Sequence, residues 1–472
     1  MRKNKIFTNV LSQSLGRATS YLLNFLSITL IARYLGVENF GVFTSTLAMV
    51  LIVSKLIDFG MGQIVFREVS RERDYTVINN AITLRLLISL FVLILSNVLI
   101  WTFSFNILET ILFNILYLNI YISSRFLNIR DLLEVPFKVE LNMHIVMAIN
   151  LIDNFLLLVL VLIMPFVKGG LIYLAVCYVI ANLPGFMLII FYLKRKFKFR
   201  FQFYLNKTGW LVRESLPLFG YVLLLVLFQQ LDLLILKKVD SNYSAGIYSV
   251  ALRLTLPLSI IPIAVITTAF PLFVKNFEDK QTPNVLVRKI INKILFGLTF
   301  SVFAFFMFKA KEIIVLIFGQ PYQAAYLPAT LLFASNVILF LNYFKLDLLT
   351  ISKKQIFNLF YALIIVLIDL SLIIVLISKY SFVGVAVAKL ISIIIGGLFL
   401  FFIFRKHIKS NLRIDFRVII WSILIMGIQN FISDFPLPIY LIISLLNVGL
   451  ITFLVKFFDI QEIQLIKSII PH

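Results

Sequence analysis

The chain has 472 residues, of which 61% are hydrophobic and only 14% are charged, and its mean hydropathy is +1.02. Soluble globular domains are about half apolar and about one quarter charged, so this composition excludes an ordinary soluble protein. The single cysteine, Cys177, and the scattered histidines exclude an intramolecular disulfide and a zinc site of the CxxC type, so no metal site is predicted.

Apolar runs between charged residues predict about fourteen transmembrane helices, since one crossing takes about 20 apolar residues. In the first half the expected spans are 8–34, 40–62, 80–103, 107–128, 141–165 and 169–193. In the second half they are 213–236, 244–273, 290–308, 326–350, 355–378, 382–404, 417–433 and 437–457. The predicted fold is therefore that of an all-α polytopic membrane protein.

The two halves of the chain resemble each other, which predicts two six-helix lobes in a parallel repeat. Segment 33–50 aligns with 238–255 and pairs Gly41 with Gly246, and two further alignments in the same order pair Asp153 with Asp369 and Gly170 with Gly384. The expected domains are an N-terminal lobe (1–193), a basic cytoplasmic linker (194–212), a C-terminal lobe (213–405), and two additional helices with a tail (406–472).

The net charge of +21 follows the predicted topology. With both termini in the cytoplasm, most Lys and Arg residues between spans fall on the cytoplasmic side, as membrane proteins prefer. The outer loops receive only Lys168, Lys237, Lys238, Lys309, Lys311 and Lys379. A nucleic-acid partner is excluded, because the basic residues are separated by apolar runs and form no polar face.

Several stretches also carry a family resemblance. They are IARYLGVENFGVFTSTLAMVLIVSKLIDFGMGQIVFREVSR, RESLPLFG, SAGIYSVALRL, FGQPYQAAYLPATLLFAS and FVGVAVAKLISI. Over about residues 1–405 the chain resembles Wzx-type flippases of the polysaccharide transport family, within the multidrug/oligosaccharidyl-lipid/polysaccharide exporter superfamily.

This resemblance implies a transporter and not an enzyme, with no catalytic residues and no cofactor. The implied activity moves a polyprenyl-diphosphate-linked oligosaccharide from the inner to the outer leaflet of the cytoplasmic (inner) membrane by alternating access, for surface polysaccharide biosynthesis. The implied partners are this lipid-linked substrate, the bilayer and other polysaccharide-assembly membrane proteins, and the implied state is a monomer. Coupling to a proton or sodium gradient is left open.

Cations inside the spans are the candidate ligands for a diphosphate. A charge at the bilayer centre costs about 2.5 to 3.5 kcal/mol, so it usually faces a cavity or a partner. Arg17 and Arg253 lie about nine residues inside the first and eighth spans, about 13 Å along each axis, and should approach the middle of the membrane. Their guanidinium groups suit a diphosphate, and Lys55 and Lys389 would supply a supporting field.

Several of these charges also have a purely structural interpretation. Lys55 and Asp58 are three residues apart on one helical face and are able to neutralise each other. Arg85, Lys293 and Lys345 lie within reach of the cytoplasmic interface and are expected to snorkel towards it.

Acidic residues inside the spans are candidates for ion coupling or for charge pairing. Asp153 and Asp369 lie near the middle of equivalent fifth and eleventh spans, where a carboxylate either takes up an ion or balances a cation. Asp58 belongs to the same group through Lys55. Asp232, near the outer end of the seventh span, is a candidate gate residue through Lys237 or Lys238.

Two other functions compete. An ion-coupled multidrug or metabolite exporter of the same superfamily would share the fold, but it should carry an acidic cavity for organic cations, and the intramembrane cations argue against this. A membrane glycosyltransferase or polymerase would need catalytic loops outside the membrane, and the longest outer connection, 309–325, holds Glu312 as its only acid.

Overall fold

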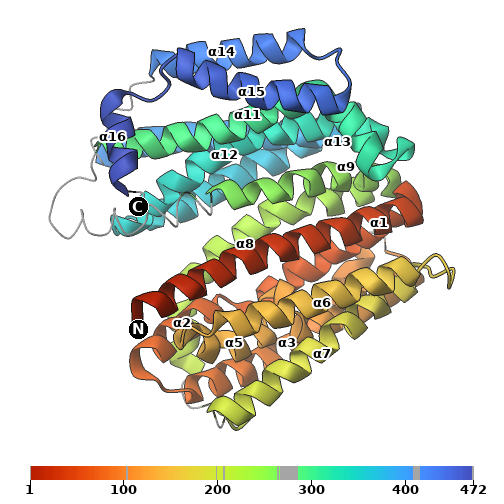
Figure 1. Cartoon of the computed structure of the whole chain (residues 1–472). Coiled ribbons are helices and arrows are strands. Elements are labelled where there is room, and N and C mark those ends of the chain that lie inside the picture. The colour runs from red at the N-terminus through yellow and green to blue at the C-terminus, as the bar shows by residue number, and fades with distance from the viewer. Residues whose placement is uncertain are drawn as a thin grey trace. The chain divides into compact units, whose positions relative to one another are not determined.

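A computed structural model describes residues 2–102, 105–197, 199–205, 208–262, 265, 285–407 and 415–469. The described residues form helices joined by short connections, and the chain divides by its contacts into two units, Met1–Ser249 and Val250–His472 (Figure 1).

The described residues of the first unit form nine α-helices, the last of which continues into the second unit. They are α1 (Arg2–Asp58), α2 (Met61–Glu72), α3 (Thr76–Thr102), α4 (Ile107–Ile122), α5 (Ile129–Val139), α6 (Met143–Ile163), α7 (Leu171–Phe197), α8 (Thr208–Val239) and α9 (Asn242–Thr255). A 3₁₀ turn, η1 (Ser124–Phe126), precedes α5. The unit includes α8, which the sequence assigns to the C-terminal lobe, and the lobe boundaries stay a prediction.

The second unit begins within α9 and contains six more described α-helices. After the 3₁₀ turn η2 (Leu256–Ser259) come α11 (Val285–Phe318), the 3₁₀ segment η3 (Gln320–Ala325), α12 (Tyr326–Ile351), α13 (Ile356–His407), α14 (Phe416–Phe431), α15 (Leu437–Leu454) and α16 (Ile460–Ile469).

These helices confirm the predicted all-α fold with about fourteen spans. Ten described helices are long and apolar enough to cross a membrane. Two of them, 43 and 51 residues long, are each able to cross twice, because α1 breaks at Gly36 and α13 at Ser381. The shorter apolar helices α4 and α14 supply the remaining two crossings. Part of the predicted span 244–273 lies outside the described residues.

Gly36 sets the break in α1 through its backbone conformation. Its φ of 73° and ψ of 174° lie in a region that is essentially restricted to glycine. Nothing lies within 4 Å of a Cβ added there, so the dihedral angles, and not a lack of space, require glycine. Ser381, the corresponding break in α13, also has a positive φ of 48°.

Two short amphipathic helices that the spans did not predict, α2 and α5, pack at one end of the first unit. α2 lies against α3, α5 and α8, and α5 lies against α2, α3, α4, α6 and α7. Their buried apolar residues recur every three or four positions, as Met61, Ile64 and Val65 show in α2. We call this end, which carries residues 59–75 and 123–142, the basic end; it is the end predicted to face the cytoplasm.

A buried arginine fastens α5 to its neighbours. The Arg130 side chain is 0% exposed, and its Nη1 lies 2.6 Å from Asp153 Oδ2 of α6. Its Nη2 donates to Asn150 Oδ1 at 2.8 Å, and its Nε donates to Glu134 Oε1 at 3.3 Å. Because Arg130 has charged or polar partners on both α5 and α6, it fixes the position of α5 on the bundle.

Glycines bring α1 and α9 into backbone contact. A Cβ added to Gly41 would lie 1.9 Å from the Asn242 carbonyl oxygen, and one added to Gly246 would lie 2.1 Å from that of Val37. Nearby, the Ser249 hydroxyl donates to Thr44 Oγ1 at 2.9 Å. The two glycines that the sequence repeat pairs are therefore the residues at which these helices touch.

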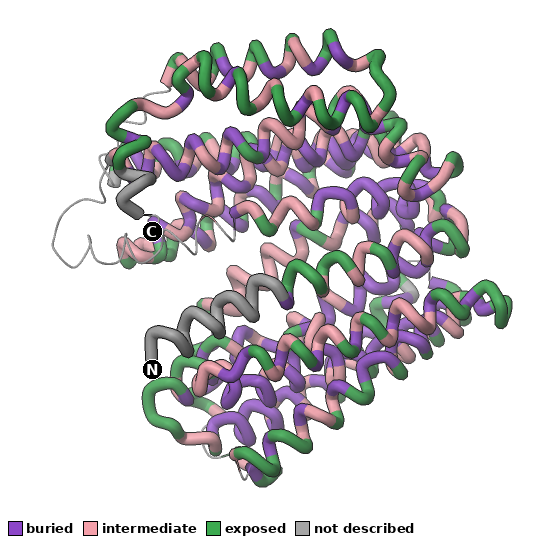
Figure 2. Tube along the Cα trace, in the orientation of Figure 1, coloured by how far each residue is buried: buried purple, intermediate pink, exposed green. Residues whose placement is uncertain are grey.

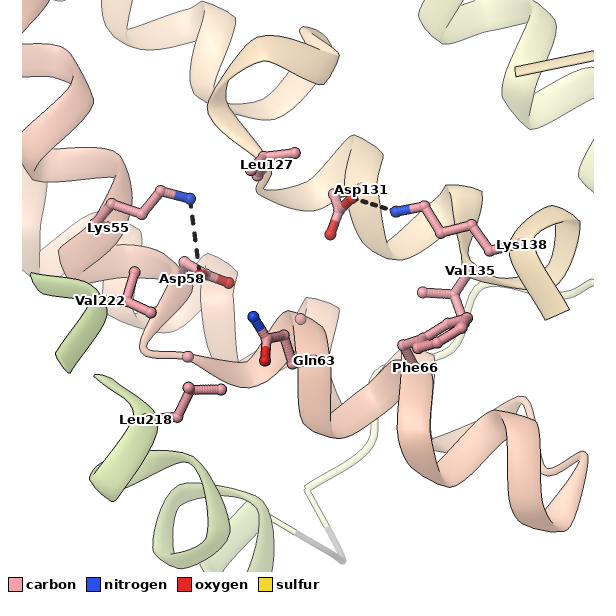
Figure 3. A pocket seen from close by; sticks show the side chains of 12 residues that line it. Lys55, Asp58, Gln63, Phe66, Leu127, Asp131, Val135, Lys138, Leu218 and Val222 are labelled. Carbon is pink, nitrogen blue, oxygen red and sulfur yellow. Dashed lines mark hydrogen bonds and ion pairs between the residues drawn. The ribbon is translucent and has the colours of Figure 1, made fainter. Parts of the chain in front are cut away.

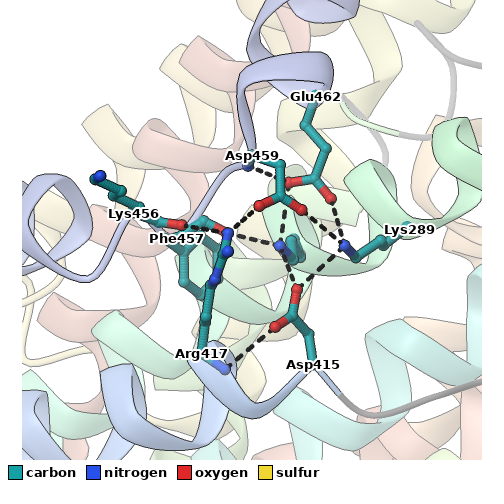
Figure 4. Close-up of polar contacts among 8 residues, drawn as sticks. Lys289, Asp415, Arg417, Lys456, Phe457, Asp459 and Glu462 are labelled. Atoms are coloured by element: carbon teal, nitrogen blue, oxygen red, sulfur yellow. Dashed lines mark hydrogen bonds and ion pairs between the residues drawn. The ribbon is translucent and has the colours of Figure 1, made fainter.

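The C-terminal helices of the second unit are joined by a network of six charges (Figure 4). Lys293 Nζ lies 2.8 Å from Asp415 and 3.1 Å from Glu462. Lys289 Nζ contacts the same two acids and Asp459, and Arg417 pairs with Asp459. Three acids thus meet three cations, and α16 is held against α11 and α14.

The share of each span that is buried separates central from peripheral helices (Figure 2). In the most apolar window of α1, 83% of the residues are buried inside the protein, compared with 28% in α3 and 17% in α15. The exposed apolar side chains of α3, such as Leu90, Phe91 and Ile94, form a surface suited to lipid.

The contact between α1 and α9 predicts that Gly41→Ala and Gly246→Ala lower thermal stability. Each added methyl group would meet backbone atoms that cannot rotate away, and overpacking of this kind costs about 1–3 kcal/mol. The measurement is the Tm of purified protein in detergent. Gly170→Ala and Gly209→Ala are matched controls, because a Cβ added at either position meets nothing within 4 Å. Equal Tm values for all four variants would contradict the contact.

Glu134 predicts an unusual pH dependence of stability. Burial raises the pKa of its carboxyl from 4.5 to about 7, although Lys138 and Arg130 oppose the shift. The folded state therefore holds a proton that the unfolded state has released, and stability should fall as pH rises from about 4.5 to about 7. The Tm measured from pH 5 to pH 8 should decline less in Glu134→Gln than in the wild type. Parallel profiles of the two proteins would refute this assignment.

Candidate functional site

A cavity of about 330 Å³ with a largely apolar wall opens at the basic end of the first unit (Figure 3). Its charged and amide side chains are Lys55, Asp58, Gln63, Asp131 and Lys138. Its apolar wall comes from several helices and consists of Phe66, Leu127, Val135, Leu218 and Val222. Amide, carboxylate and ammonium groups thus face one space bounded by apolar side chains, as is typical of ligand pockets.

Lys55 and Arg85 share one carboxylate beside this cavity. Lys55 Nζ lies 3.9 Å from Asp58 Oδ2, while Arg85 Nη2 pairs closely with Asp58 Oδ1. Arg85 also donates to the Asn128 carbonyl oxygen at 2.6 Å. Arg85 is 0% exposed, so the expectation that it snorkels to the interface is wrong; Asp58 compensates its charge inside the protein. Two cations meet one acid here, which leaves a positive excess.

The buried charges of the second unit correct a similar expectation. Lys293 is 4% exposed and pairs with Asp415 and Glu462, so it does not snorkel to the interface. Lys345 is half-buried and lies 3.5 Å from Asn342 Oδ1.

Arg17 lies on the first arm of α1 at the same end of the unit as Lys55. It is exposed and has no ion pair or hydrogen bond with the described residues of its own unit. Its neighbour Gly16 packs on Met147, near the start of α6. Arg17 and Lys55 are each 19 residues from Gly36, about 28 Å along their arms. That Arg17 approaches the middle of the membrane stays a prediction.

Arg253 belongs to the second unit. It is half-buried in α9, 11 residues after the helix begins at Asn242, or about 16 Å along the axis. The α-helix ends two residues later and gives way to the 3₁₀ turn η2, which contains Pro257. The predicted position of Arg253 near the middle of span 244–273 stays a prediction, since part of that span lies outside the described residues.

Both candidate coupling carboxylates have cationic partners. Asp153, 5% exposed, pairs with Arg130, and Gly185 leaves room for it, since a Cβ there would lie 2.1 Å from Asp153 Oδ1. Asp369, 2% exposed, lies 4.0 Å from Lys389 Nζ, and the Ser392 hydroxyl donates to it at 3.5 Å. The structure thus pairs Lys389 with Asp369 across the break in α13.

At the opposite end of the first unit, Lys237 pairs with an acid that the sequence did not single out. Its Nζ lies 2.5 Å from Glu109 Oε1, and both side chains are 3% exposed. The ammonium also lies 4.0 Å from the centre of the Phe105 ring. Asp232, 0% exposed, accepts a hydrogen bond of 2.6 Å from the Tyr248 hydroxyl. A second cavity, of about 370 Å³, is lined by Glu38, Asn106, Glu109, Lys237, Ser241, Asn242 and Tyr243.

Sequence reasoning missed the site residues that lie on α2 and α5. Gln63, Asp131 and Lys138 fall between the predicted spans 40–62, 107–128 and 141–165. The signal that identifies them is the helical period of buried apolar residues in 61–72 and 129–139, which places the polar side chains on the opposite face.

Comparison with known proteins identifies the family. Residues 6–277 match the family model described as polysaccharide biosynthesis protein. No curated protein sequence matches the chain.

Solved structures share the fold. The chain is similar to the lipid II flippase MurJ in an inward closed conformation, with 18% identity over 94% of this chain and 98% of that one and a TM-score of 0.79. An inward-facing multidrug resistance MATE family transporter of the MOP superfamily has 14% identity over 84% and 96% of the two chains and a TM-score of 0.62.

A third similar structure is a MOP superfamily transporter from Pyrococcus furiosus Vc1, with 15% identity over 87% and 97% of the two chains and a TM-score of 0.60. Since the family model covers more than half of its length, the chain belongs to the polysaccharide biosynthesis protein family, and it has the multi-pass membrane fold of the MOP superfamily.

Proposed function

We propose that the protein flips a polyprenyl-diphosphate-linked oligosaccharide from the inner to the outer leaflet of the cytoplasmic membrane by alternating access. The observation that carries this proposal is the excess of positive charge at the basic end of the first unit. There Lys55 and Arg85 share Asp58, and Arg17 is exposed at the same end. A diphosphate brings the negative charge that such a site lacks.

The proposed ligands divide by geometry. The Arg17 guanidinium holds two phosphate oxygens in a fork, whereas the Lys55 ammonium acts as a point charge. Because Arg17 and Lys55 lie at similar distances from Gly36, they meet a head group entering from the cytoplasmic boundary. Arg253, deeper in its own unit, receives the diphosphate at a later stage of the crossing.

Cytoplasmic termini and a location in the inner membrane belong to this proposal. They are supported by the concentration of Lys and Arg in alternate connections, because those connections are then cytoplasmic. The basic end of the first unit consequently faces the compartment in which lipid-linked oligosaccharides are made.

We assign the intramembrane acids to charge pairing and not to ion coupling. Asp153 and Asp369 each have an internal cation, Arg130 at 2.6 Å and Lys389 at 4.0 Å. A carboxylate that is already neutralised has little electrostatic reason to take up sodium. Lys389, held in this way, contributes little field to the substrate.

The gate at the outer end of the first unit consists of the Glu109–Lys237 pair, which joins α4 to α8. Asp232 supports it by holding Tyr248. A buried pair of this kind is costly to separate, so it favours the closed state of that end.

Removal of the proposed diphosphate ligands at the basic end should reduce transport. In proteoliposomes carrying a fluorescent polyprenyl-diphosphate oligosaccharide, Arg17→Ala and Lys55→Ala should each lower the initial rate by about ten- to a hundredfold, since a hydrogen bond to a charged group contributes about 1.5–3 kcal/mol. Arg17→Lys should recover part of the rate, because it restores the charge without the fork.

The matched control for Arg17 is Arg33→Ala, which removes an exposed arginine towards the other end of the same arm. Its rate should stay close to that of the wild type. If the wild-type protein moves none of several lipid-linked glycans but exports organic cations, the flippase proposal is wrong. The multidrug-exporter function then takes its place.

Charge pairing predicts the behaviour of a double substitution. Asp369→Asn alone should lower the Tm, because it leaves the Lys389 ammonium buried without its carboxylate, whereas Asp369→Asn with Lys389→Met should recover stability. The double variant should keep the wild-type response of transport to imposed proton and sodium gradients. A folded double variant that loses that response would show that Asp369 couples an ion.

A further inference from the structure

The cavity at the basic end contains hydrogen-bonding groups that the diphosphate does not use. Gln63 is exposed on α2, and its amide has no hydrogen bond with the described residues of the first unit. Asp131 pairs with Lys138 through Oδ1, and its Oδ2 lies close to Gly62. An amide and a carboxylate oxygen therefore face the cavity with hydrogen-bonding capacity left over (Figure 3).

The backbone around Gly60 and Gly62 shapes this space. Gly60 has a φ of 73°, a left-handed conformation that turns the chain from α1 into α2. A Cβ at Gly62 would lie 3.2 Å from Asp131 Oδ2 and 3.3 Å from Arg85 Nη2. Two glycines thus let α2 approach the charged groups closely enough for Gln63 to line the same cavity.

The chemistry of the cavity favours a sugar over a phosphate. The cavity lining balances the carboxylates of Asp58 and Asp131 with the ammonium groups of Lys55 and Lys138, so these four side chains together carry no net charge to hold a phosphate. Their carboxylates accept hydrogen bonds from hydroxyl groups, and the Gln63 amide both donates and accepts them. The apolar wall formed by Leu127, Val135, Leu218 and Val222 suits the carbon face of a pyranose ring. The volume of about 330 Å³ lies at the lower end of the range for small-molecule pockets.

Lys55 connects the cavity to the proposed diphosphate site, because its side chain lines the cavity. The part of the substrate next to the diphosphate is the first sugar. We infer that this cavity binds the lipid-proximal sugar of the glycan, and that Gln63 and Asp131 select its hydroxyl pattern. This inference rests on the proposed function, because it takes the glycan from that substrate.

The test uses the scarcity of cysteine in this chain. Its one cysteine, Cys177, is buried, so Gln63→Cys creates a defined site for a maleimide in protein held in nanodiscs. Polyprenyl-diphosphate monosaccharide at about ten times its Kd should lower the labelling rate about tenfold by occupancy. Polyprenyl diphosphate without the sugar should leave the rate unchanged. Ser70→Cys, exposed elsewhere on α2, should react equally in both cases.

A second measurement concerns selectivity. Two substrates whose first sugars are epimers should be transported at different rates by the wild type. Gln63→Leu and Asp131→Asn should each lower the ratio of these two rates about tenfold, because the loss of one hydrogen bond of about 1.4 kcal/mol has that effect. Competition by sugar-free polyprenyl diphosphate should not change. A control variant, Ser70→Ala, should keep the wild-type ratio.

The outcomes separate the two claims. Equal protection by both lipids would overturn the sugar site and assign the cavity to the diphosphate. No protection by a substrate that the wild type transports would also overturn it. Protection by the glycosylated lipid without any transport would retain the sugar site and refute the flippase function. The absence of both protection and transport would refute both.

Discussion

The arrangement of this protein depends on the cost of placing a charge away from water without a partner. A span that is apolar on all sides has no preferred face or depth, but a buried charge fixes both by the position of its partner. In the first unit the partners come from different helices. Arg130 joins α5 to α6, and Arg85 joins α3 to α1. Removing one member of such a pair destabilises the fold by more than the intact pair stabilises it, because the other charge is left buried without a partner. These contacts therefore determine how the helices are arranged more than they add to the stability of the fold.

The number and order of the spans were predictable because they follow from apolar length alone. The amphipathic helices α2 and α5 were not predicted, because a search for about 20 apolar residues passes over helices of 12 and 11 residues. Their periodicity was present in the sequence. A local pattern of apolar residues therefore predicts that such a helix exists. Whether its apolar face is buried depends on how the long helices of the bundle pack around it.

The candidate site was only partly predictable, for reasons of distance along the chain. Lys55 and Asp58 are neighbours on one helical face, so their contact is visible in the sequence. Asp153 lies inside a predicted span, but its partner Arg130 lies 23 residues earlier, between predicted spans. The sequence likewise places Lys237 in an outer loop, although its side chain is 3% exposed beside Glu109. Pairs between distant helices carry no local signal.

The break at Gly36 has a mechanical consequence. Since nothing lies within 4 Å of an added Cβ, the space beside Gly36 at the junction of the two arms of α1 is open. The angle between the arms is therefore set along their lengths, by the backbone contact of the second arm with α9 and by the packing of the first arm on α6. The two arms therefore respond separately: a shift of the α9 contact displaces the second arm, which carries Lys55, and a shift of the α6 contact displaces the first arm, which carries Arg17.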